Sequence, residues 1–472
     1  MATHNFSLRF RRGVTVTTTP ERRIRIRLGD LYTDRPDTPE SQRLFETLSS
    51  PEAPSTPGVL ATAPFGFWTG FTLPQLEALG LIQYEALHAG TLVLALEPTA
   101  RLARPQWQSL APGARVKASR FAQLRLEEGR AFIETPLAAA RMAIADPTFA
   151  VLWAMLAQPK SVEECAAAAP AWGEETVRRC FELLLAACVA YVTDDLGDIP
   201  EQRDAALQLW SSHELMFHAR SRIGRHDLPY GAWFLLRDRI PEPAPRPRLY
   251  EGPPILLSEP PADVAERCSL SLMKSMTARR SAREWDEEDP IGIESIGHLL
   301  WLSCRIKSTY ITSGPGPVTY EHIYRPAPSA GSMGELEIYV LADRCAGLPA
   351  GAYHYDSHGH RLFRLPGEDS HRKTLLDGMQ TAMNAQRPPQ AALIVTARHP
   401  RMLWKYSSVG YSLELKDAGV LFQTWYLLSA ALGIGACAVG MGDADTFCRL
   451  NGTNYYDESS IGEFALGSVP KN

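Results

Sequence analysis

The sequence predicts an α+β protein in which two small strand-and-helix modules precede one larger domain. Short strands of alternating apolar residues recur along the chain, helices follow them, and prolines gather between residues 240 and 261, separating two unlike halves. Repeated prolines favour an extended connector over a packed element. We therefore expect modules at residues 1–112 and 113–198, a helical and proline-rich linker at 199–254, and a domain at 255–472.

The composition is that of a globular protein without a bulk positive charge. The 472 residues are 45% hydrophobic and 21% charged, with a formal net charge of -5, which does not suit a nucleic-acid binder that depends on charge. The N-terminus lacks the basic and apolar regions of a secretory signal. The uncharged run at residues 418–442 contains Gln423, Thr424 and five glycines, which favours a buried helix that breaks near Gly433 over a membrane span. We expect a cytoplasmic protein with no membrane and no nucleic-acid partner.

The cysteines and histidines do not form a recognisable metal site. None of the eight cysteines belongs to a C-x-x-C pair, so we expect reduced, mostly buried thiols. A predicted helical stretch at residues 202–222 holds His213 and His218, whose spacing of five does not place both on one helical face. The histidines at 354–360 fall on a predicted hairpin without a neighbouring cysteine or clustered carboxylate. We expect no bound metal.

The first module opens with strands and continues with two helices. Apolar residues alternate in residues 6–10, and apolar and basic residues alternate from Arg23 to Leu28. We expect one helix near residues 39–48 and a second that starts at Thr72, with a capping hydroxyl and a glutamine at the capping-box position. A strand at residues 90–96 closes the module.

The second module repeats this order of elements without repeating the sequence. A hairpin around Gly129 leads to a helix near residues 148–156 and then to a capping box from Ser161 to Glu164. A helix near residues 175–187 and a short strand at 189–192 complete the module. Strands followed by short helices, ending in a helix and a strand, form the layout of a winged helix.

The winged-helix layout leaves more than one role open. Winged helices commonly bind DNA, and the arginine face at residues 23–27 could serve that purpose. The candidate recognition helices at residues 73–85 and 175–187 are not net basic, whereas a helix in the major groove needs cationic and amide side chains. We favour a role in which an extended peptide segment adds a strand to a sheet edge. An inert scaffold with a solvated arginine face is the alternative.

The last 200 residues carry an ordered series of motifs. The series begins with Arg279-Arg280-Ser281-Ala282-Arg283, whose guanidiniums and hydroxyl are the groups that hold a phosphate. Small residues in a later loop let a flat ligand approach backbone amides. The further segments are a helix at 293–302, the loop Pro328 to Ser332, strands at 336–341 and 391–396, the pair Lys405-Tyr406, an apolar helix after Asp417, and Gly435 to Gly442.

This order resembles the nitroreductase-like flavin fold, and within it the azoline oxidases. These are the SagB-type dehydrogenases that mature thiazole and oxazole peptides, including those of cyanobactin pathways. The matching pieces are Arg-Arg-Ser-x-Arg, Pro-Ser-Ala-Gly with a Glu-Leu-Glu-Ile-Tyr strand, Gly351-Ala-Tyr-His-Tyr355, Lys405-Tyr406, and Asp417-Ala-Gly with a later Leu-Gly-Ile-Gly turn. The resemblance covers residues 255–472 and implies a nitroreductase-like FMN domain. The N-terminal half is similar to the leader-peptide-binding winged helices of that biosynthetic setting.

The resemblance implies roles for individual residues. The segment that grips the FMN phosphate and ribityl chain is matched by Arg279, Arg280, Ser281 and Arg283. The loop that packs beside the flavin is matched by Pro328, Ser329, Ala330, Gly331 and Ser332, and the stretch that faces the isoalloxazine edge by Val439, Gly440, Met441 and Gly442. Family members are dimers with FMN at the subunit interface, so the resemblance implies a homodimer in which this loop serves the partner's flavin. The basic residue that many nitroreductases place on the phosphate is absent at Gly467-Ser468, and Lys471 is a candidate replacement.

Lys405 and Tyr406 match the Lys-Tyr pair associated with catalysis in azoline oxidases. Aromatising a thiazoline or oxazoline removes a proton from one ring carbon and a hydride from its neighbour, and a flavin accepts the hydride. A lysine whose pKa is lowered by partial burial and nearby cations can take the proton. Tyr406 then polarises the ring nitrogen or relays the proton.

The leading hypothesis is FMN-dependent oxidation of azoline rings in a ribosomally made precursor peptide, with oxygen as the electron acceptor. The precursor's leader is then the partner of the N-terminal modules. One alternative keeps the flavin and makes the protein an NAD(P)H-dependent nitro or quinone reductase. The other is a winged-helix regulator whose C-terminal domain senses flavin.

Overall fold

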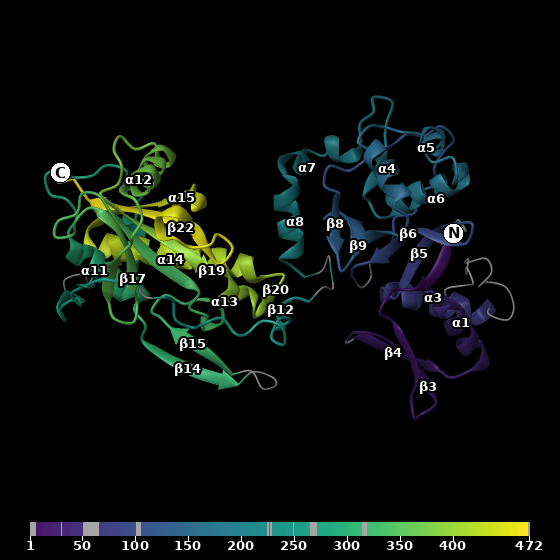
Figure 1. Cartoon of the computed structure of the whole chain (residues 1–472), viewed down its shortest axis with the longest axis horizontal. Helices are drawn as coiled ribbons and strands as arrows, with labels where there is room; N and C mark the ends of the chain where they lie inside the picture. The colour runs from purple at the N-terminus through teal and green to yellow at the C-terminus, as the bar shows by residue number, and fades with distance from the viewer. Residues whose placement is uncertain are drawn as a thin grey trace. The chain divides into compact units, whose positions relative to one another are not determined.

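The computed structural model describes residues 6–29, 31–50, 66–100, 105–223, 226, 229–248, 250–264, 271–313 and 319–470. The chain divides into two compact units, Met1–Pro229 and Tyr230–Asn472 (Figure 1). The division falls inside the predicted linker at residues 199–254. Helices and strands mix in both units, in agreement with the predicted α+β class.

One six-stranded antiparallel sheet runs through the first unit. Its order is β1 (Ser7–Phe10), β5 (Ile82–His88), β6 (Thr91–Pro98), β10 (Ala140–Ile144), β9 (Arg130–Glu134) and β8 (Gln123–Glu127). Because β6 pairs with β10 from Pro98 opposite Ala140 to Leu94 opposite Ile144, the sheet continues across the predicted module boundary at residues 112 and 113. The winged-helix assignment of each module remains a prediction.

The remaining elements of the first unit follow the predicted order. A three-stranded sheet of β2 (Thr15–Thr18), β3 (Arg23–Leu28) and β4 (Leu31–Pro36) precedes α1 (Pro39–Ser49) and α3 (Gly66–Ala78). In the second half, α4 (Thr148–Met155), α5 (Val162–Ala168) and α6 (Gly173–Ala186) lead to β11 (Ala190–Val192), which pairs with β7 (Val116–Ala118). The predicted capping box of Ser161 and Glu164 is confirmed.

Two predicted helical segments of the first unit have different boundaries in the structure. Helix α3 begins at Gly66 instead of Thr72. The candidate recognition helix at residues 73–85 is wrong beyond Ala78, because the chain then enters β5, which is hydrogen-bonded on both sides by β1 and β6. The predicted helical stretch at 202–222 is divided into η1 (Pro200–Gln202), α7 (Ala205–Leu209) and α8 (Ser212–Arg220), because the side chains of Asp204 and Ser211 cap new helix starts.

A seven-stranded antiparallel sheet forms the centre of the second unit. Its order is β13 (Ile255–Leu256), β18 (Arg361–Arg364), β17 (Gly351–Asp356), β16 (Leu336–Ala342), β19 (Ala391–Arg398), β22 (Glu458–Ser468) and β21 (Ile434–Val439). Apolar side chains of α11 (Ile293–Cys304) and α14 (Gly410–Leu432) pack with one face of the sheet. Side chains of α12 (Asp369–Met383) and α15 (Ala444–Asn451) pack with the other. Burial on both faces explains why β16 and β19 are continuous apolar runs in the sequence.

Helix α14 organises the site described below. It ends at Gly433, whose φ of 71° is left-handed, and β21 starts at Ile434, so the predicted break is confirmed. The helix begins at Gly410, before the predicted start at Asp417. Among the described helices, none combines the length and the apolar character that crossing a bilayer needs.

Candidate functional site

The arginine cluster follows α10 (Leu272–Ala278) and runs beside the edge strand β21. Arg279 forms the C-cap of α10, and the Ala282 N–H donates to the Ala436 carbonyl at 2.8 Å. The Arg279 guanidinium lies 5.1 Å from the centre of the Tyr426 ring, and Ser281 Oγ lies 3.0 Å from the Tyr426 hydroxyl. None of the cluster's three arginines pairs with a carboxylate that the structure describes. Their charge is therefore available to an anion.

A cavity of about 130 Å³ lies beside this cluster. Arg279, Arg280, Ser429, Gly433 and Gly435 are among the residues that line it. The Ser429 hydroxyl is buried and has no hydrogen-bond partner in the described part of the chain. Two guanidiniums, a free hydroxyl and glycine walls suit a phosphate group, so the residues present fit the phosphate end of FMN.

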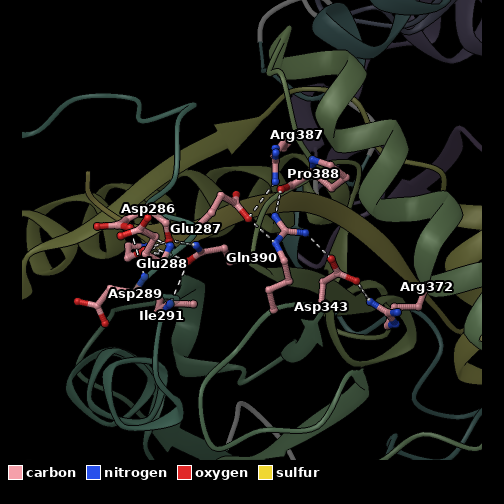
Figure 2. Close-up of polar contacts among 12 residues, drawn as sticks. Asp286, Glu287, Glu288, Asp289, Ile291, Asp343, Arg372, Arg387, Pro388 and Gln390 are labelled. Carbon is pink, nitrogen blue, oxygen red and sulfur yellow. Dashed lines mark hydrogen bonds and ion pairs between the residues drawn. The ribbon is translucent and has the colours of Figure 1, made fainter. Parts of the chain in front are cut away.

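Polar contacts fix the chain on the C-terminal side of the arginine cluster (Figure 2). The Gln390 side chain donates to the Asp286 carbonyl at 2.7 Å and accepts from the Ile291 N–H at 2.9 Å. Glu287 pairs with Arg387 at 3.5 Å. This anchoring to the sheet limits where the preceding cluster can lie.

The stretch predicted to face the isoalloxazine directly follows β21. Val439 ends the strand and is buried, whereas Met441 is exposed. A strand rises about 3.3 Å per residue, so Ala436 beside the arginine cluster lies roughly 10 Å from Val439, and a ligand that touches both must be elongated. A Cβ at Gly442 would overlap the Glu463 carboxyl, so any other residue there requires this carboxyl to move.

The loop from Pro328 to Ser332 lies directly beside Lys405 and Tyr406. Gly331 has a left-handed φ of 57°, and a Cβ at this position would overlap the Tyr406 hydroxyl and come within 3.2 Å of the Lys405 amine. Glycine therefore permits the close approach of the loop backbone to both side chains. The structure brings these two predicted parts of the site together.

Contacts from two other elements hold this loop. The Ala330 N–H donates to Asp417 Oδ2 on α14 at 2.8 Å, and His322 Nδ1 donates to the Gly331 carbonyl at 2.8 Å. Glu335 is fully buried beside Asp417, and burial together with that carboxylate raises the pKa of Glu335 well above its ordinary value. Burial raises the pKa of Asp417 as well, so the two carboxyls hold a proton more tightly than two separate, solvated carboxyls would.

Lys405 is buried among aromatic rings and a second cation. Its amine lies 4.5 Å from the centre of the Tyr320 ring and 5.2 Å from that of Tyr406. The Arg401 guanidinium lies 4.4 Å from the same Tyr320 ring. Burial, and then the Arg401 charge, lower the pKa of Lys405, while Glu242 opposes this in part. The environment thus favours the neutral amine, which is the form that accepts a proton.

The pKa of Tyr406 is shifted in the opposite direction from that of Lys405. Burial raises the pKa of its phenol, and the carboxyl groups of Glu335 and Asp417 raise it further. The phenol therefore remains protonated and can donate a hydrogen bond. A proton acceptor and a proton donor lie next to each other in the chain.

The predicted site residues fall at two ends of α14. Asp417 holds the loop beside Lys405 and Tyr406, whereas Tyr426 contacts the arginine cluster. Nine residues separate these positions, which is about 13 Å along a helix. Lys471 lies outside the described residues.

The sequence prediction missed several groups around the site. Arg401 lies four residues before Lys405, and this spacing of about one helical turn was the available signal. Tyr320 and Glu242 come from distant segments that carry no motif. Among the described residues, the structure shows no cluster of three or more metal-ligating side chains.

Comparison with known families agrees with this geometry. Residues 276–467 match the model of the nitroreductase family. The C-terminal unit therefore contains a nitroreductase-like domain. Residues 116–227, before this nitroreductase-like domain, match the model of the cyanobactin oxidase ThcOx. The two matches confirm the predicted resemblance.

Individual relatives cover parts of the chain. A protein of Methanocaldococcus jannaschii described as a nitroreductase is 27% identical over 171 residues, which are 36% of this chain and 79% of that protein. The trifolitoxin-processing protein TfxB of Rhizobium leguminosarum bv. trifolii is 29% identical over 119 residues, 25% of this chain and about a third (32%) of the relative. A solved nitroreductase from Ralstonia eutropha has 23% identity and a TM-score of 0.37, with 52% of this chain and 100% of that chain covered.

Proposed function

We propose that this chain is an FMN-dependent oxidase of thiazoline or oxazoline rings in a ribosomally made precursor peptide, with oxygen as the electron acceptor. The observation that carries the proposal is the buried Lys405 amine, whose pKa is lowered, next to the protonated Tyr406 phenol in a nitroreductase-like domain. A nitro or quinone reductase needs no buried base to take a proton from carbon. An azoline oxidase does.

FMN would be held by the groups whose chemistry fits it. Arg279, Arg280 and the Ser429 hydroxyl line the cavity for the phosphate, and the backbone from Val439 to Gly442 follows the same strand. Bound there, FMN supplies an acceptor for a hydride from carbon. The match to the nitroreductase family and the arginines without a described carboxylate partner support this cofactor.

The residues of the chain account for the proton part of the reaction. The Lys405 amine accepts the proton from one ring carbon, while the Tyr406 phenol donates a hydrogen bond to the ring nitrogen. A hydride leaves the neighbouring carbon. The ring has then lost one proton and one hydride, and it becomes aromatic. Oxygen takes up the two electrons and two protons as hydrogen peroxide. The net change in the peptide is the loss of two hydrogens.

The proposal of a peptide substrate rests on the N-terminal unit and on a relative of the chain. The ThcOx match at residues 116–227 and the name of the trifolitoxin-processing relative both support a precursor peptide. The first unit would bind its leader by strand addition at a sheet edge. A homodimer would let the loop and the Lys405-Tyr406 pair of one copy act on the flavin of the other.

The experiment measures both the bound cofactor and the conversion of an azoline peptide. The purified protein should be yellow, denaturation should release FMN, and a thiazoline peptide should become lighter by two hydrogens in air. A colourless protein that takes up no FMN would contradict the proposal. The nitroreductase name of the M. jannaschii relative supports the alternative, so rapid flavin reduction by NADPH without conversion of any azoline would favour a reductase instead.

A further inference from the structure

The first residues of the C-terminal unit, 230–248, lie along the segment that carries Lys405, and we call them the strap. Strand β12 (Gly231–Ala232) of the strap pairs with β20 (Tyr406–Ser407). The Phe234 N–H donates to the Lys405 carbonyl at 3.2 Å, and the Trp404 indole N–H donates to the Ile240 carbonyl at 2.8 Å. The backbone on both sides of Lys405 is therefore held by the strap.

The strap also supplies the carboxylate that pairs with Arg401. Arg401 is 1% exposed, and its Nη1 lies 2.7 Å from Glu242 Oε1. The same guanidinium donates to the carbonyls of Pro243 and Met333, each at 3.2 Å, and to that of Glu321. A guanidinium with this many fixed acceptors cannot rotate away from its neighbours. It is a permanent cation beside Lys405.

Lys405 and Arg401 share one aromatic surface, the ring of Tyr320. Two cations on the same ring disfavour the protonated lysine, whereas the Glu242 carboxylate offsets part of the Arg401 charge. The other titratable groups around the amine are Tyr406, on the same segment, and His322, whose ring lies 5.0 Å from that of Tyr320. Glu242 is the one carboxylate among the groups that act on the amine in the described structure.

We propose that Glu242 is a positioning residue for the reaction, which through Arg401 sets the position and the proton affinity of Lys405. The strap, at the start of the C-terminal unit, is thereby a part of the catalytic site. This inference rests on the proposed function of Lys405 as the base.

Glu242→Gln tests the inference, because the carboxylate is partly exposed (27%) and glutamine keeps its shape. Removing its charge leaves Arg401 uncompensated, so the Lys405 pKa falls and the acid limb of the kcat/KM profile moves to lower pH. Because the Glu242 charge is partly exposed and therefore screened by water, we expect the acid limb to move by about 0.2 to 0.7 pH units. Asp238→Asn is the matched control, since Asp238 lies on the same strap with an 89% exposed side chain. This control and the charge-retaining Glu242→Asp variant should keep the wild-type profile.

A second readout does not depend on azoline turnover. Labelling of the FMN-loaded protein with trace acetic anhydride across a pH series, followed by mass spectrometry of the Lys405 peptide, measures the pKa of that amine directly. A lower labelling pKa in Glu242→Gln without azoline oxidation by the wild type would support the role of Glu242 and contradict the proposed function. Two results would overturn the inference about Glu242. In the first, the protein oxidises azolines, but Glu242→Gln shifts neither the acid limb of the kcat/KM profile nor the labelling pKa of Lys405. In the second, Asp238→Asn causes an equal shift.

Discussion

Glu463→Gln offers a direct test of the electrostatics beneath the predicted flavin edge. Glu463 lies on β22 opposite Val439, and its carboxyl packs against Gly442. Burial raises the pKa of Glu463 from 4.5 to about 7, although a hydrogen bond from Ser460 opposes the shift. Glutamine keeps the size of the side chain and removes its titration.

The direction and magnitude of the effect follow from the two pKa values. Below pH 4.5 the carboxyl is protonated in the folded and the unfolded chain, so it does not distinguish them. Between pH 4.5 and 7 the unfolded chain ionises first, and folding loses stability as the pH rises. At about 1.36 kcal/mol per pKa unit, the shift from 4.5 to about 7 costs about 3 kcal/mol, and the full loss is present above pH 7.

The assay is thermal or urea unfolding of wild type and Glu463→Gln at pH 5 and pH 8. Because part of the loss is already present at pH 5, the variant should gain about 2.5 kcal/mol relative to the wild type between these pH values, or roughly 5–10 °C in Tm for a unit of this size. Asp377→Asn, an exposed carboxylate on α12, should show no such gain. A stability difference between Glu463→Gln and wild type that does not change with pH would refute the reasoning.

Three further predictions concern the site. Lys405→Ala should abolish azole formation while denaturation still releases FMN, and retained turnover would remove Lys405 from the mechanism. Arg283→Ala should weaken FMN binding by about 1.5–3 kcal/mol in a fluorescence titration, whereas Arg387→Ala, whose guanidinium pairs with Glu287, should leave the affinity unchanged; equal losses in both would contradict a phosphate role for Arg283. Mixing the Lys405→Ala and Arg283→Ala proteins at limiting FMN should restore turnover if each site draws on two copies, and no gain would place both groups in one copy.

Local patterns predicted most elements of the C-terminal unit. The apolar runs of β16 and β19 and the helix break at Gly433 are properties of a few consecutive residues. The wrong recognition helix had a different origin, because the segment from Ile82 to Glu85 is a strand only by virtue of its partners β1 and β6. The pairing of β6 with β10 likewise joins segments about 45 residues apart in the sequence, and no local sequence pattern predicts this pairing.

Some residues of the candidate site could be predicted from local sequence motifs, and others are brought there only by the tertiary fold. The sequence named Lys405 and Tyr406, and the structure adds that Gly331 allows the loop to lie against both. The groups that tune the lysine are Tyr320, Arg401 and Glu242. Only Arg401 is near it in sequence, so the environment that lowers the pKa of the amine arises from tertiary contacts.

The arginines proposed to bind FMN differ from the structural arginines of this domain in having no described carboxylate partner. Arg372 and Arg401 are almost fully buried, and each has a carboxylate partner, Asp343 or Asp369 for the first and Glu242 for the second. A buried guanidinium without such a partner would be costly. The cluster from Arg279 to Arg283 is more exposed and has no described carboxylate partner, so an anion from outside the chain would relieve its mutual repulsion. An anion that binds the folded state alone stabilises the domain, and we therefore expect added FMN or inorganic phosphate to raise the Tm of the protein, and the Arg283→Ala substitution to reduce that gain.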